Sequence, residues 1–129
     1  MARRHEDWLA QAKRDLKAAR DSLEDGNYEW SAFQAQQSAE KAIKALLRYH
    51  NIEATGHTIL HLLKRAEEVT TLPDELKMMA QELDRHYIPP RYPNIFERGY
   101  PGEFYNEETA RRCIDYAERF VDLVAAKIS

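Results

Sequence analysis

Residues 28–50 read YEWSAFQAQQSAEKAIKALLRYH, and this stretch decides the fold class. Its apolar side chains recur at steps of three and four residues, which predicts a single helix over the whole stretch. The narrowest apolar stripe consists mostly of small residues: Ala32, Ala35, Ala39, Ala42 and Leu46. Small side chains allow a neighbouring helix to approach closely, so we expect this helix to lie at the centre of the fold.

The other side of the same helix is polar. It carries Gln34, Gln37, Ser38, Glu40, Lys41, Lys44 and Arg48. Glu40 and Lys44 have the spacing of an i,i+4 ion pair. Charged residues in such an arrangement are typical of a solvated helix face. Lys41 and Lys44 could instead line a binding groove, and the sequence leaves both interpretations open.

Working outward, the same periodicity predicts four further helices. They cover residues 5–24, 59–69, 73 to about 87, and 106–128. Asp25-Gly26-Asn27 is expected to reverse the chain between the first two helices. Pro89-Pro90 removes two backbone donors and ends the fourth helix. We therefore predict an all-α fold, an antiparallel up-and-down helical bundle of four main helices plus one shorter helix, forming one domain over residues 1–129.

Composition limits the classes of function. The 129 residues are 43% hydrophobic and 32% charged, with a net charge of -3, which argues against a general nucleic-acid coat but leaves room for a local basic patch. The one cysteine, Cys113, falls on an apolar helix face, and no Cys/His spacing fits a zinc site. We expect no metal and no cofactor. No stretch is apolar enough for a membrane span or a signal peptide, so a cytoplasmic protein is expected.

The connection before the last helix is unusual. Residues 88–105 read IPPRYPNIFERGYPGEFY, which we predict to be a long segment without regular structure. Such connections are uncommon in compact domains and are often functional. This one is rich in aromatic residues and arginine, which suits an anionic ligand.

Three blocks of sequence resemble the HEPN domain family, named for higher eukaryotes and prokaryotes nucleotide-binding. They are the helix from Tyr28, then Gly56-His57 followed by Leu62-Leu63, and then His86-Tyr87-Ile88-Pro-x-Arg91-Tyr92-Pro93-Asn94. The blocks occur in the same order along nearly the whole chain. The resemblance implies a helical bundle that is often a homodimer. It also implies a stand-alone prokaryotic protein paired with a minimal nucleotidyltransferase, in several cases as toxin and antitoxin.

The resemblance also implies a possible ribonuclease activity. Many toxic members carry Arg, four to six intervening residues and then His, with the histidine serving as general acid or base and the arginine stabilising phosphate charge. This chain departs from that pattern, because no histidine follows any arginine at that distance. His86 precedes Arg91, in the reverse order, and these two residues are the catalytic candidates.

Candidate residues for binding a nucleotide or RNA phosphate are Arg85, His86, Tyr87, Arg91, Tyr92, Lys41, Lys44 and His57. Each has a structural alternative. His57 could cap the third helix, and the aromatic residues could fasten the 88–105 segment to the bundle.

Three interpretations follow from these residues. The first is a dimeric binding module that holds nucleotide or RNA phosphate through Arg91 and works with a nucleotidyltransferase partner. The second is a ribonuclease with a non-standard pair such as His86 and Arg91. The third is a structural subunit without a ligand. We favour the first, and the wide apolar arcs of the second and last helices lead us to expect a homodimer.

Overall fold

A computed structural model describes residues 4–128 of the chain and confirms the all-α fold class. Residues 1–3 and 129 of the predicted domain 1–129 lie outside that range. Within it there are six α-helices, one short 3₁₀ helix and no strand. The α-helices are α1 (Arg4–Glu24), α2 (Tyr28–Tyr49), α3 (Ile59–Glu67), α4 (Glu75–Asp84), α5 (Pro101–Phe104) and α6 (Glu107–Ile128), and the 3₁₀ helix η1 is Pro93–Ile95.

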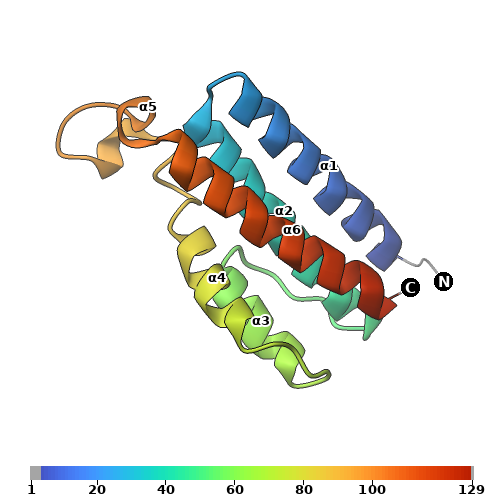
Figure 1. Ribbon diagram of the computed structural model, residues 1–129. Coiled ribbons are helices and arrows are strands. Elements are labelled where there is room, and N and C mark those ends of the chain that lie inside the picture. Colours follow the sequence, from blue (N-terminus) through green and yellow to red (C-terminus); the bar gives the residue numbers. More distant parts are fainter. Residues whose placement is uncertain (1–3, 129) are drawn as a thin grey trace.

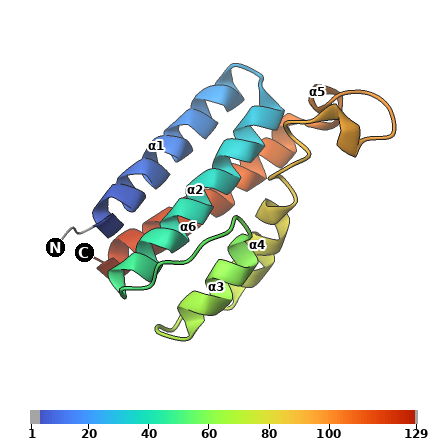
Figure 2. The same ribbon diagram turned by 180° about the vertical axis from the view of Figure 1, so that it is seen from behind.

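The three long helices α1, α2 and α6 lie side by side and form the body of the bundle (Figures 1 and 2). The shorter α3 and α4 form a hairpin that packs against α2 and α6. Helices α1, α2, α4 and α6 alternate in direction along the chain, as predicted, and the two ends of the described chain lie close together. The fourth helix is shorter than expected, because it begins at Glu75 and ends at Asp84.

Helix α2 approaches α1 closely along a seam of small residues. The Ser31 hydroxyl donates to the carbonyl of Ala19 at 2.8 Å, and the Ser38 hydroxyl donates to the carbonyl of Ala12 at 2.7 Å. A serine side chain can reach the backbone of a neighbouring helix only when the two backbones are close. The turn between these helices contains Gly26 at φ +78°, a conformation that glycine adopts without steric cost.

The expectation of a solvated polar face on α2 is wrong. Ser38, Glu40 and Lys44 are buried. Ser38 and Lys44 contact α1, at the Ala12 carbonyl and the Trp8 ring, and Glu40 contacts His57 in the segment 51–58, which runs back along α2 (Figure 2). The Lys44 ammonium lies 3.1 Å from the Glu40 carboxylate, in the predicted i,i+4 pair. A buried ion needs a partner of opposite charge. Helix α2 can therefore lie at the centre of the fold only because Glu40 and Lys44 pair with each other.

The apolar arcs of α2 and α6 are covered within a single chain. Phe120, the largest fully buried side chain, lies on α6 with Val121 and Val124. These arcs were the basis for expecting a homodimer. Since the chain itself buries them, the homodimer remains a prediction without support from these two helices.

The 88–105 segment is more ordered than predicted. It contains η1 and α5, and it projects as a lobe from one end of the bundle (Figure 1). The rings of Phe96 and Phe104 stack at 4.3 Å between centroids, and the Glu103 carboxylate accepts a hydrogen bond from the Tyr100 amide at 3.3 Å. Proline at the start of both short helices suits the first helical turn, and this signal was present in the sequence.

Candidate functional site

The guanidinium group of Arg91 lies among three aromatic rings. Its central carbon is 4.4 Å from the centroid of Phe33, 4.7 Å from Tyr87 and 5.2 Å from Tyr92. The Nε–H group donates to the carbonyl of Tyr87 at 2.8 Å. One hydrogen bond and three ring contacts therefore hold this half-buried side chain in a single orientation.

Arg91 differs from many other arginines of the chain in having no acidic partner. None of the ion pairs formed within residues 4–128 includes Arg91, and the only hydrogen bond of its side chain in that range uses Nε. By contrast, Arg111 lies 2.7 Å from Glu107 and Arg119 lies 2.9 Å from Glu75. The two terminal nitrogens of Arg91 thus keep donors suited to an anion.

His57 extends this aromatic cluster. Its ring stacks on Tyr87 with 4.8 Å between centroids and 17° between planes. Nδ1 lies 3.3 Å from the Glu40 carboxylate, and Gln36 donates to the His57 carbonyl at 3.0 Å. The imidazole remains 56% exposed although its carboxylate partner is buried. Side chains of α2 therefore fix the position of His57 beside the Arg91 cluster.

His57 does not cap α3, contrary to the structural alternative. The capping group is the Asp84 carboxylate, which accepts from the amides of Ile59 at 2.8 Å and Leu60 at 3.0 Å. Burial raises the pKa of Asp84, although these two backbone hydrogen bonds oppose that shift. Asp84 is more than 20 residues away in sequence, at the end of α4, so local sequence patterns give no signal for this cap.

Arg85 and His86 lie at a different junction. His86 is buried, with Nδ1 2.8 Å from the hydroxyl of Tyr105 and Nε2 3.0 Å from Glu82. Desolvation lowers the pKa of His86, although the Glu82 carboxylate opposes that shift. The Arg85 side chain is mostly exposed and lies 4.0 Å from Glu82. This histidine thus ties the end of α4 to the segment that leads into α6.

The lysines are also used in structural pairs. Lys41 lies 2.7 Å from Asp15 and so joins α2 to α1, while Lys44 forms its ion pair with the buried Glu40 carboxylate. Of the eight predicted residues, the structure gathers His57, Tyr87, Arg91 and Tyr92 in one cluster, with Lys44 connected to it through Glu40. The cluster also includes Phe33, which sequence reasoning missed. Phe33 had one indication in the sequence: it is an aromatic residue on the same side of the predicted helix as Glu40, about two turns earlier.

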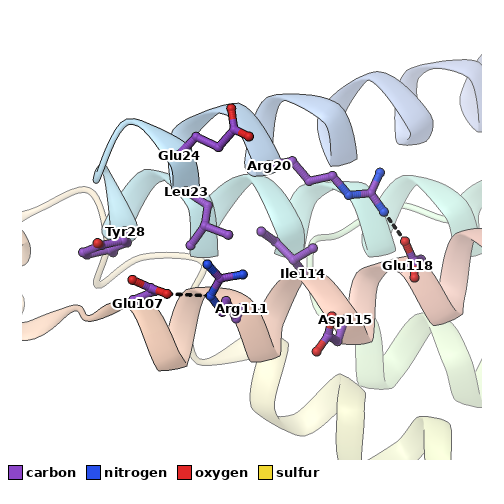
Figure 3. Close-up of a pocket in the computed structure, with 9 residues that line it drawn as sticks. All are labelled: Arg20, Leu23, Glu24, Tyr28, Glu107, Arg111, Ile114, Asp115 and Glu118. Carbon is purple, nitrogen blue, oxygen red and sulfur yellow. Dashed lines mark hydrogen bonds and ion pairs between the residues drawn. The ribbon is translucent and has the colours of Figure 1, made fainter.

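A groove between α1 and α6 offers a contrast (Figure 3). It contains two arginines, but Arg20 pairs with Glu118, and Arg111 pairs with Glu107. Glu24 and Asp115 line the same groove, so carboxylates outnumber cations there. An anionic ligand would be repelled, which leaves the Arg91 cluster as the better candidate.

Other classes of site have little support. In the described part of the chain, no group of three or more His, Cys, Asp or Glu residues is placed to hold a metal ion. Burial raises the pKa of the Cys113 thiol to about 12, so it behaves as an unreactive apolar group. None of the helices over residues 4–128 has the length and apolarity to span a membrane.

The HEPN domain family model matches residues 5–128, so the chain belongs to the HEPN domain family. Among curated proteins, "Putative toxin MJ1304" of Methanocaldococcus jannaschii is 27% identical over 126 residues, which cover 91% of this chain and 83% of that protein.

Three solved structures are similar over almost their full length. TT1696 from Thermus thermophilus superposes with a TM-score of 0.94 at 38% identity, covering 98% of this chain and 99% of that one. ST0689, described as an archaeal HEPN homologue, gives 0.83 at 42% identity over the whole of both chains. The HEPN domain protein tm0613 from Thermotoga maritima gives 0.77 at 30% identity, covering 95% and 97%.

The buried state of His86 predicts a pH dependence of stability. Because the folded pKa is lowered from an ordinary value of 6.5, the folded state binds fewer protons than the unfolded state. The stabilising contribution of neutral His86 to the free energy of unfolding is therefore complete above about pH 6.5 and is lost as the pH falls below that value. The free energy of unfolding in urea should be measured for wild type and His86→Gln from pH 7.5 to 5.5. The difference between the two proteins should become smaller toward low pH. Parallel curves would contradict a buried, neutral His86.

Proposed function

We propose that this HEPN protein binds the phosphate of a nucleotide or RNA through Arg91. The observation that supports this most is a fixed guanidinium group without a carboxylate partner in the described chain. Most of the ordering of a flexible arginine has already been done by the rings and by the Tyr87 carbonyl. A phosphate therefore meets preorganised donors, and one charge-assisted contact is worth about 1.5–3 kcal/mol.

Arginine suits this position better than lysine. Its planar group stacks on aromatic faces while its terminal nitrogens remain able to bind two oxygens of one phosphate. His57, about half exposed and stacked on Tyr87, adds a second polar group to the same aromatic cluster. The predicted contributions of Arg85 and His86 are not part of this proposal, because those residues lie at the junction with Glu82.

We further propose that the protein acts in a toxin–antitoxin-like pair with a minimal nucleotidyltransferase. The support is membership of the HEPN family and the name of the Methanocaldococcus jannaschii relative. A homodimer belongs to the same proposal. Exposed apolar side chains at the lobe, such as Ile95 and Phe104, are available for contact with another protein.

Titration with ATP, GTP and a short RNA tests the phosphate site. Arg91→Ala should weaken binding about tenfold or more, because about 1.4 kcal/mol corresponds to one decade in Kd. Arg91→Lys should recover only part of the loss, since lysine keeps the charge but loses the planar fork. Arg65→Ala is the matched control, because Arg65 is an exposed arginine on α3 that pairs with Glu68.

Melting temperatures of all four proteins should be measured beside the titrations. Equal affinities for wild type and Arg91→Ala, or no binding by wild type, would reject the Arg91 site and favour the structural-subunit interpretation.

For the ribonuclease alternative, a different histidine is better placed than His86. His57, and not the buried His86, is exposed beside the Arg91 cluster and has a carboxylate that orients its ring. In that reaction, His57 would take the proton of a ribose 2′-hydroxyl, and the 2′-oxygen would attack phosphorus. The bond to the 5′-oxygen would break and that oxygen would gain a proton from water, leaving a 2′,3′-cyclic phosphate. Arg91 would balance the added charge.

The binding proposal predicts that purified protein leaves end-labelled single-stranded RNA intact in the presence of EDTA. Cleavage above background would favour the enzyme interpretation, provided that His57→Gln abolishes it and His86→Gln retains it. The cleaved 5′ fragment should then end in a cyclic phosphate. Cleavage that survives His57→Gln would point to a contaminating nuclease or another site.

A further inference from the structure

Two exposed aromatic rings lie in or beside the Arg91 cluster. Trp30, in the first turn of α2, is 45% exposed, and Tyr92, in the segment after α4, is 47% exposed. The Trp30 and Phe33 rings meet edge to face with 6.2 Å between centroids, and the guanidinium group of Arg91 lies over the Phe33 ring. Tyr92 contacts the same guanidinium group directly. Tyr92 thus lies against the cation and Trp30 lies one ring away from it, and about half of each residue remains exposed.

We propose that the ligand of the Arg91 site is a single-stranded nucleic acid, with Trp30 and Tyr92 as stacking platforms for two of its bases. An internal phosphodiester of the strand would lie at Arg91. This inference rests on the proposed phosphate site and names its ligand class. Aromatic side chains beside a cation are the usual means of holding a single strand, because every base has a face that can stack.

A strand fits this arrangement better than a free mononucleotide. The two open rings come from separate elements, and each is linked to the same guanidinium group. A mononucleotide has one base and could occupy only one of them. A strand offers a base on either side of each internal phosphate. The overall charge of -3 also means that attraction to a polyanion must be local, so stacking has to supply part of the affinity.

Fluorescence can observe one platform directly. The chain has two tryptophans, so in a Trp8→Phe variant Trp30 is the sole tryptophan. The probes are an RNA oligoadenylate of about four nucleotides, ATP and inorganic phosphate, with excitation at a wavelength that adenine does not absorb. The oligoadenylate should quench Trp30 fluorescence in a saturable manner and bind about tenfold more tightly than ATP, whereas inorganic phosphate should cause little quenching. Adding Arg91→Ala should abolish the response to the oligoadenylate.

Substitutions test both platforms. Trp30→Ala and Tyr92→Ala should each weaken oligoadenylate binding about tenfold, and Trp30→Phe should retain most of the affinity because a ring remains. Tyr49→Ala is the matched control, since Tyr49 is an exposed aromatic residue at the opposite end of α2. Circular dichroism and melting temperature establish that each variant is folded.

The outcomes separate this inference from the function on which it rests. If the oligoadenylate and ATP bind alike in an Arg91-dependent way without quenching Trp30, the phosphate site stands and the stacking inference is wrong. If no probe binds to wild type, both are wrong. If Trp30→Ala or Tyr92→Ala changes the sedimentation mass but not oligoadenylate binding, the rings belong to a protein interface and the inference is overturned.

Discussion

The burial of polar groups on α2 is the constraint on which the rest of the structure depends. This helix has α1, α6 and α3 against it, and residues 51–58 cover much of what remains. A buried polar group without a partner would cost a large part of the stability of a small domain. Every buried side-chain nitrogen and oxygen atom in the described chain has a partner. Ser31 and Ser38 use the backbone of α1, and Glu40 uses Lys44 and His57.

These requirements also build the candidate site. Glu40 and Gln36 hold His57, His57 stacks on Tyr87, and the carbonyl of Tyr87 receives the Nε–H of Arg91. This series of contacts thus runs from the centre of the bundle to its surface. At its end is a cation whose position is set by packing and not by a carboxylate. That difference separates Arg91 from the arginines of the groove in Figure 3, which are already neutralised.

The fold could be predicted from sequence to a large extent because helical periodicity and turn residues are local signals. Asn106, for example, opens the predicted last helix and caps α6 by accepting from the amide of Thr109. The candidate site could be predicted from the sequence only in part. His57, Tyr87 and Arg91 could be selected by residue type, but their partners come from distant segments: Glu40 lies 17 residues from His57. The burial of His86 depends likewise on Tyr105, 19 residues away, and no local pattern distinguishes a buried histidine from an exposed one.

The central claim is that packing presents Arg91, already oriented, to an anionic strand. The most direct test is NMR of protein with ¹⁵N-labelled arginine, with the Arg91 Nε–H signal assigned through Arg91→Lys. The account predicts a signal shifted by the currents of the surrounding rings, protected from exchange by the Tyr87 carbonyl, and displaced further when the oligoadenylate is added. A signal at the position of a free arginine, exchanging rapidly with water and unmoved by the oligoadenylate, would contradict it.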